Sequence, residues 1–197
     1  MTPLPYSNPA ARIAFYAVFV SFVLLEWRVR FRSRRNRDGT PTDQGSLYVV
    51  IASVVVGLLG GFALAVKAPG ASIAQARWAF FVAGLALMIT GVVIRQWAVI
   101  TLGRFFTVDV RVHSGQTVVE RGPYRWVRHP SYTGMILTFV GLGLALGNWA
   151  SLAVLVVVPT AGLVVRIHYE ERALGDGLGE PYRRYAATHA RLLPGVW

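Results

Sequence analysis

The chain has 197 residues, of which 54% are hydrophobic and only 15% charged, and its mean hydropathy is +0.49. About a quarter of the residues of a soluble domain are charged, so this chain has too little polar surface for a water-soluble globule. The absence of cysteine excludes disulfides, thiolate metal sites and a cysteine nucleophile, and no other pattern predicts a metal site. The net charge of +11 indicates arginines that face anionic lipid headgroups rather than nucleic acid.

Four apolar stretches are predicted to lie in the membrane, since one crossing needs about 20 apolar residues. They cover residues 10–27, 47–66, 78–100 and 132–167. The first stretch is interpreted as a membrane helix rather than as a cleaved signal peptide. The fourth is too long for one helix and slightly short for two ordinary ones, and the turn residues Gly147 and Asn148 interrupt it.

The distribution of arginine predicts that the fourth stretch is a hairpin of two short helices. Segments 28–37, 103–129 and 166–191 hold most of the arginines, whereas the opposite side has only Arg12, Lys67 and Arg77. Basic segments remain on the cytoplasmic side, so an even number of crossings must separate the last two. The sequence therefore predicts an all-α integral membrane protein with about five helices, its N-terminus outside and its C-terminus in the cytoplasm.

Pairs of glycines predict close helix packing within this bundle. Gly57 and Gly61 lie four residues apart, as do Gly143 and Gly147. Small residues at this spacing let two helix backbones approach one another.

The polar segments between the helices differ in character. Residues 28–46 are interpreted as a plain cytoplasmic loop, with Asp38, Gly39 and Pro41 as turn residues. Residues 103–131 are too long for a simple connector and contain several aromatic residues, which favours a functional loop. Alternation at residues 108–112 predicts a short extended piece. Pro130 is expected to start the fourth helix and to place His129 at its N-cap boundary.

An acidic pair, Glu170 and Glu171, follows the last membrane helix beside His168. Acidic residues at the membrane edge are costly unless they are paired, and they suggest function. Their expected partners are Arg166 and the arginines of segment 121–128. A solvated helix end with local ion pairs remains the alternative. Arg95, at the end of the third helix, is expected to extend to the membrane interface rather than to bind a ligand.

Two segments in this order resemble the isoprenylcysteine carboxyl methyltransferase family. The first reads GPYRWVRHPSYTG, and the second, after the short hairpin, reads RIHYEERALGDGLGEPYRRYAATHARLLP. The resemblance covers roughly residues 95–194 and extends to phospholipid N-methyltransferases and membrane sterol reductases. It implies a methyltransferase that uses S-adenosylmethionine. It also implies that this cofactor is held between the first segment and the C-terminal helix. The sequence does not contradict this, because it has no strand followed by a glycine-rich nucleotide-binding loop.

The resemblance also implies the site residues. His129, Pro130 and Tyr132 match the family's RHPxY element, Glu170 and Glu171 match its paired glutamates, and Tyr124, Arg125 and Arg128 belong to the same cofactor loop. Tyr182, Tyr185 and the Arg191–Pro194 ending match the closing segment. Within a single membrane domain, residues 1–102 would form three helices and residues 103–197 the catalytic region.

The methyl acceptor is expected to be lipophilic, either a small molecule or a lipid-modified substrate that approaches through the membrane lipids. A carboxylate like that of isoprenylcysteine needs no general base, and Arg104 or Arg166 is the candidate for orienting it. A lipid amine or a thiol would instead use His129, His113 or His168 as a base.

The pair Glu170 and Glu171 favours a methyltransferase over a reductase that uses NADPH, and a non-enzymatic membrane protein is the third reading. The abundance of arginine and a single lysine favour a prokaryotic plasma membrane. The sequence leaves the oligomeric state open.

Overall fold

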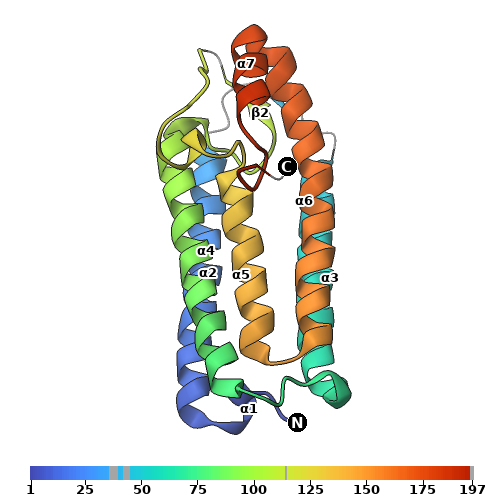
Figure 1. The fold of residues 1–197 in the computed structure, drawn as a ribbon. Coiled ribbons are helices and arrows are strands. Elements are labelled where there is room, and N and C mark those ends of the chain that lie inside the picture. The colour runs from blue at the N-terminus through green and yellow to red at the C-terminus, as the bar shows by residue number, and fades with distance from the viewer. Residues whose placement is uncertain (36–39, 42–44, 114, 196–197) are drawn as a thin grey trace.

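The computed structural model describes residues 1–35, 40–41, 45–113 and 115–195, and it arranges the long helices as a roughly parallel bundle (Figure 1). In chain order the elements are α1 (Leu4–Ser7), α2 (Pro9–Arg35), β1 (Thr40–Pro41), α3 (Ser46–Lys67), η1 (Pro69–Ala71), α4 (Arg77–Leu102), η2 (Gly103–Phe105), β2 (Arg111–Val112), η3 (Gly122–Arg125), α5 (Pro130–Leu146), α6 (Trp149–Leu178) and α7 (Glu180–Thr188).

The predicted membrane helices are confirmed. Within the described part of the chain, four segments are long and apolar enough to cross a membrane: Pro9–Ser33, Ser46–Lys67, Arg77–Phe105 and Trp149–Leu178. The shorter α5 is equally apolar in character and lies among them. The chain is therefore an all-α integral membrane protein, and α5 and α6 form the expected hairpin. Only α5 is short as predicted, since α6 has 30 residues and continues beyond the apolar stretch to Leu178.

The hairpin turns at Gly147, whose backbone φ of 65° lies in the left-handed region that favours glycine. Asn148 then caps α6, because its side-chain oxygen accepts a hydrogen bond from the Ser151 amide at 3.0 Å. The Ile73 amide donates to the carbonyl of Gly147 at 2.8 Å, so the turn between α3 and α4 lies beside the hairpin turn. Both turns share one end of the bundle with the N-terminus (Figure 1). Gly147 thus makes a turn and not the helix contact expected for it.

The other glycines pack as predicted, and the closest backbone approach joins α4 to α5. A Cβ atom on Gly57 would lie 2.8 Å from the ring of Pro159 in α6, so this glycine lets α3 and α6 pack closely. A Cβ atom on Gly84 would lie 2.6 Å from the carbonyl oxygen of Gly141 and 2.5 Å from the amide of Ala145. Backbone atoms cannot move aside as a flexible side chain can, so α4 and α5 depend on glycine here.

Replacement of Gly84 by Ala is expected to lower the free energy of unfolding by about 1–3 kcal/mol, because the added methyl group overpacks this crossing. Thermal unfolding in detergent measures the change. Gly175→Ala is the matched control, since Gly175 also lies in a helix but has no atom within 4 Å of its Cβ position. Equal melting temperatures for the two variants would refute the tight crossing.

Helix α2 is longer than the apolar stretch that predicted it. It continues to Arg35, so the interpretation of residues 28–35 as loop is wrong. Arginine is a good helix former, and the buried Val29 and Ser33 give this extension an inward face. Asp38 and Gly39 lie outside the described residues.

The extension of α2 holds part of the long loop. The Ser33 hydroxyl accepts a hydrogen bond from the Val108 amide at 2.7 Å. Strand β1 pairs antiparallel with β2, with Thr40 opposite Val112. Of the extended piece predicted at residues 108–112, the last two residues, Arg111 and Val112, form a strand. Together these contacts hold this part of the loop at the end of the bundle.

Candidate active site

A cavity of about 370 Å³ lies at the end of the bundle that is covered by the long loop between α4 and α5. Its inner end is apolar and lined by residues such as Phe22 from α2, Val54 from α3 and Phe139 from α5. Its outer end is polar and includes Tyr124, Arg128, His129, Glu170 and Tyr182. One continuous space therefore joins an apolar chamber in the bundle to a polar chamber beneath the loops.

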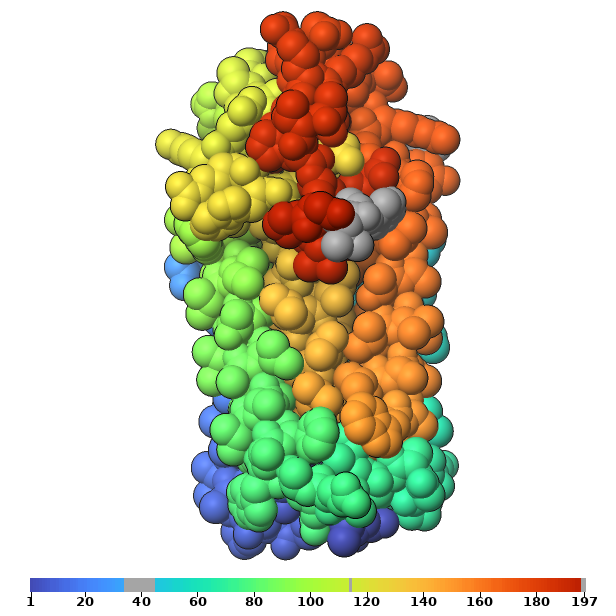
Figure 2. Space-filling view, viewed as in Figure 1, coloured from blue at the N-terminus to red at the C-terminus, as the bar shows by residue number. Residues whose placement is uncertain are grey.

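The start of α5 forms one wall of the polar chamber. Pro130 is the first helical residue and His129 the N-cap, as the sequence predicts. The segment after α7 runs beside this turn: the Arg128 amide donates to the carbonyl of Ala190 at 2.8 Å, and the His129 amide donates to the carbonyl of Arg191 at 2.9 Å. Figure 2 shows this C-terminal segment lying across the face of the bundle between α5 and α6.

The carboxylate of Glu171 joins three parts of the chain. It accepts from Arg128 at 2.9 Å, from the ring of His129 at 3.3 Å and from Arg191 at 3.0 Å. Glu171 and Arg128 are both largely buried, with 14% and 11% of their side-chain surfaces exposed. The expected pairing of the acidic residues with segment 121–128 is thus confirmed for Glu171, and this carboxylate connects α6, the start of α5 and the C-terminal segment.

The carboxylate of Glu170 makes a different contact. The Tyr132 hydroxyl donates to it at 2.6 Å, and Arg166 Nε donates to the same hydroxyl oxygen at 3.4 Å. Arg166 also donates to Ser46 Oγ at 2.9 Å and to the carbonyl of Val108. Glu170 and Arg166 therefore face the cavity through Tyr132, and Arg166 fastens the loop above it.

Buried tyrosines complete the polar chamber. The Tyr185 hydroxyl donates to the carbonyl of Tyr124 at 2.6 Å, which places α7 against the loop. The Tyr182 hydroxyl is buried without a hydrogen-bond partner among the described residues, and so is Arg128 Nε. Burial, and next the Glu171 carboxylate, raises the pKa of Tyr182, and burial raises that of Tyr124. Both hydroxyls stay protonated at neutral pH and can donate hydrogen bonds.

The sequence-predicted site residues separate into two groups. Those that line the cavity are Arg166, Tyr124, Arg128, His129, Tyr132 and Glu170. Those outside its lining are Arg104, Arg125, Pro130 and Glu171.

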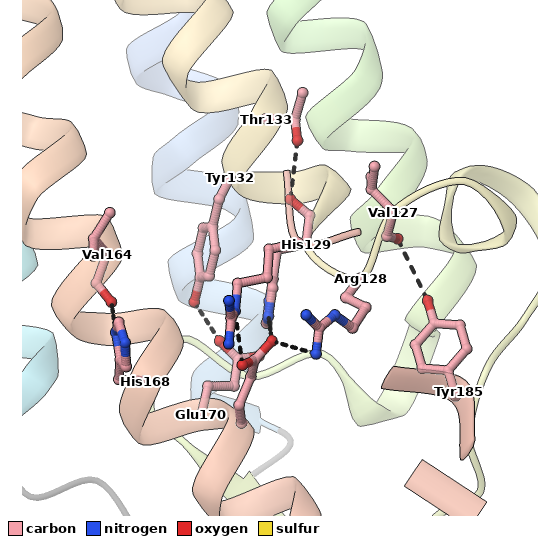
Figure 3. Close-up of polar contacts among 11 residues, drawn as sticks. Val127, Arg128, His129, Tyr132, Thr133, Val164, His168, Glu170 and Tyr185 are labelled. Atoms are coloured by element: carbon pink, nitrogen blue, oxygen red, sulfur yellow. Dashed lines mark hydrogen bonds and ion pairs between the residues drawn. The ribbon is translucent and has the colours of Figure 1, made fainter. Parts of the chain in front are cut away.

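Two of the arginines outside the lining are exposed and rest on aromatic rings. The guanidinium of Arg104 lies 4.8 Å from the ring centre of Phe105, and that of Arg125 lies 4.2 Å from the ring centre of Trp126. His168 is also exposed, and its ring bonds to the carbonyl of Val164 in its own helix (Figure 3). Of the three histidines considered as bases, only His129 lines the cavity.

The expectation for Arg95 is wrong. Only 6% of this residue is exposed, and its guanidinium forms an ion pair with Glu26 of α2 and donates to Ser131 Oγ at 2.6 Å. All three side chains line the cavity. The local sequence around Arg95 holds no signal for a partner 69 residues away, whereas the single acidic residue within the first apolar stretch is such a signal.

Comparison with known proteins shows which proteins the chain is similar to. The sequence model of the isoprenylcysteine carboxyl methyltransferase (ICMT) family matches residues 84–176. Protein-S-isoprenylcysteine O-methyltransferase A of Arabidopsis thaliana is 37% identical over 57% of this chain and 58% of its own length. Protein-S-isoprenylcysteine O-methyltransferase of Schizosaccharomyces pombe is 27% identical over 87% of this chain and 78% of its own length.

A solved structure of the eukaryotic intramembrane Ras methyltransferase ICMT has the same fold, with a TM-score of 0.69, 21% identity and coverage of 98% of this chain and 70% of that one. The chain spans less than two thirds of the length of the plant relatives that it matches. The matched residues include His129, Glu170 and Arg95, which line the cavity, and Glu171. Over about half of its length the chain is therefore similar to the isoprenylcysteine carboxyl methyltransferase family, and it shares the fold of the solved ICMT structure.

Proposed function

We propose that this chain is a membrane methyltransferase that transfers the methyl group of S-adenosylmethionine to the carboxylate of a lipophilic, isoprenylcysteine-like acceptor. The observation that carries the proposal is the continuous cavity. Its apolar chamber suits a prenyl chain, and its polar chamber suits a charged, nucleoside-containing methyl donor. Both residues 1–102 and residues 103–197 contribute side chains to the lining of this cavity.

The donors of the polar chamber fit S-adenosylmethionine. Its carboxylate needs a cation, and Arg128 has a buried Nε atom without a partner in the described part of the chain. Its ammonium and ribose hydroxyls need an acceptor, and the cavity-facing carboxylate of Glu170 provides one. The tyrosines Tyr124 and Tyr182 offer aromatic faces for an adenine or a sulfonium, and Tyr182 has an unpartnered hydroxyl.

The proposed reaction makes few chemical demands on the side chains. When bound, S-adenosylmethionine supplies an electrophilic methyl group on a positive sulfur. A carboxylate acceptor is already ionised at neutral pH, so no proton needs to move. A carboxylate oxygen would form the new bond to the methyl carbon while the bond from that carbon to sulfur breaks, and S-adenosylhomocysteine would leave with the electron pair of that bond. The protein would contribute alignment of the two molecules and exclusion of water. Arg166 and Tyr132, which lie in the cavity wall, orient the reacting groups.

A methyl-transfer assay tests the proposal. Protein in lipid vesicles is supplied with S-adenosylmethionine that carries a labelled methyl group and with an N-acetylated S-prenylcysteine. We expect a methyl ester, which mild alkali hydrolyses to labelled methanol. A label that is stable to alkali, or that is transferred equally well to prenyl amines or thiols, would contradict a carboxylate acceptor.

We further propose that the chain lies in a prokaryotic plasma membrane with its N-terminus outside and the cavity at the cytoplasmic side. The arginine-rich segments lie at the cavity end, opposite the N-terminus (Figure 1), and basic segments favour the cytoplasm. Relatives named for isoprenylcysteine methylation support lipid-modified substrates as partners.

Cysteine labelling tests this orientation cleanly, since the native chain has no cysteine. In intact cells, a maleimide that cannot cross the membrane is expected to label Gly70→Cys, in the exposed turn between α3 and α4. The matched variant Thr188→Cys, exposed at the end of α7, is expected to react only after the cells are opened. Labelling in the reverse order would refute the orientation.

A further inference from the structure

A polar cluster crosses the boundary between the two chambers of the cavity. It consists of Glu26 from α2, Arg95 from α4 and Ser131 from α5, and all three residues line the cavity. Arg95 Nε donates to one carboxylate oxygen of Glu26, and Nη2 donates to the other at 2.7 Å. The third guanidinium nitrogen, Nη1, donates to Ser131 Oγ at 2.6 Å. Each nitrogen of Arg95 is therefore engaged by the protein itself.

The position of this cluster follows from its neighbours. Phe22 lies one helical turn before Glu26, and its ring contacts that of Phe139 at the apolar end, with 6.5 Å between the centres. Tyr132, next to Ser131, reaches the Glu170 carboxylate at the polar end. An acceptor whose chain fills the apolar chamber and whose reacting group points to the polar chamber must pass this cluster. This placement rests on the function proposed above.

The ion pair of Glu26 and Arg95 has the arrangement that an acceptor carboxylate would make. Two parallel N–H donors of a guanidinium bind the two oxygens of a carboxylate with directional specificity. Glu26 thus occupies the place of a carboxylate ligand. Exchange of one carboxylate for another would keep the buried guanidinium paired throughout, which avoids the large cost of an isolated buried charge.

Glu26 also has somewhere to go. Its side chain is 25% exposed, against 7% for Arg95, so the carboxylate is the accessible member of the pair. Arg30 lies one turn further along α2, lines the cavity, is exposed, and has no acidic partner among the described residues. Residues four apart on a helix lie side by side, so Arg30 can receive the displaced carboxylate.

We propose that Glu26 is a specificity-determining residue, an internal carboxylate that occupies Arg95 in the empty cavity and is exchanged for the carboxylate of the acceptor while it moves to Arg30. The exchange selects acceptors with a chelating anion. Amines and thiols, which cannot chelate the guanidinium, leave Glu26 in place. Glu26 therefore competes with the acceptor for Arg95 and does not hold the methyl donor.

The test measures KM and kcat for an N-acetylated S-prenylcysteine in the Glu26→Gln variant. Removal of the competing charge is expected to lower KM about tenfold, with kcat changed less than twofold and the affinity for S-adenosylmethionine unchanged in calorimetry. The uncharged amide of the same compound, used as an inhibitor, is expected to bind the variant no better than the wild type. Glu180→Gln, at an exposed glutamate of α7, is the matched control and should alter nothing.

A second variant, Arg30→Gln, keeps the buried ion pair and so avoids a folding defect. It is expected to raise KM for the acceptor about tenfold, because the displaced carboxylate loses its alternative partner. A raised KM in folded Glu26→Gln, or an unchanged KM in Arg30→Gln, would overturn the proposal. If the wild type binds S-adenosylmethionine but esterifies no prenylcysteine, the proposed function itself fails, whereas normal wild-type activity with the contrary KM values overturns only the role of Glu26.

Discussion

The variant Glu170→Gln is expected to lose 10- to 100-fold or more in affinity for S-adenosylmethionine while remaining folded in detergent. The Glu170 carboxylate faces the polar chamber and has one hydrogen-bond partner among the described residues, Tyr132. A hydrogen bond to a charged group contributes about 1.5–3 kcal/mol, which corresponds to this loss of affinity. Calorimetric titration measures binding, and size-exclusion chromatography confirms the fold. Glu180→Gln provides the matched control, since Glu180 is exposed and does not line the cavity.

The same loss is expected for His129→Ala. The ring of His129 stacks on that of Tyr132, with 5.5 Å between their centres, and is buried in the wall of the chamber. Its removal frees Tyr132 and one side of the Glu171 carboxylate. Normal affinity for S-adenosylmethionine in both Glu170→Gln and His129→Ala would refute the proposed cofactor site.

The second large effect is expected at Glu171, and it concerns stability. Glu171→Ala leaves Arg128 and Arg191 without their buried carboxylate, and breaking a buried ion pair from one side costs about 3–5 kcal/mol. The C-terminal segment then keeps its backbone hydrogen bonds and the bond from Thr133 but loses this carboxylate. We expect a lower melting temperature in detergent and rapid cleavage by trypsin after Arg191.

Arg184→Ala is the control for this result. It removes the exposed pair between Glu180 and Arg184, which is 3.7 Å long and should contribute less than about 1 kcal/mol. If Glu171→Ala melts like Arg184→Ala and its C-terminal segment resists trypsin, Glu171 does not hold that segment in place.

The two glutamates illustrate what the sequence can predict of the site. Adjacent residues on a helix point about 100° apart, so the two glutamates need not face the same cavity, and only Glu170 lines it. The sequence shows the pair, but it does not show which of the two glutamates faces the cavity. The choice depends on the return of the C-terminal segment to Arg128 and His129, a contact across some 60 residues that no local pattern encodes.

The fold was more predictable than the site, for physical reasons. The length of an apolar stretch is set by membrane thickness, and the placement of arginine is set by membrane topology. These two rules suffice for the five helices and the hairpin at Gly147. They say nothing about helical extension beyond the membrane, which is why α2 was expected to end near Trp27 although it continues to Arg35.

Arg95 shows the same limit of sequence-based prediction for a residue within a membrane helix. An arginine near the end of a helix ordinarily extends to the interface. Here Glu26, on another helix, provides an ion pair that makes burial possible. A buried pair of this kind is determined by tertiary packing between α2 and α4.

Calorimetric titration of the purified wild-type protein, with S-adenosylmethionine and with NADPH in parallel, tests the central claim most directly. Binding of S-adenosylmethionine alone is the predicted result, and it would assign the polar chamber to a methyl donor. Binding of NADPH alone would contradict the claim, move the protein to the reductase class and reverse the interpretation of Glu170.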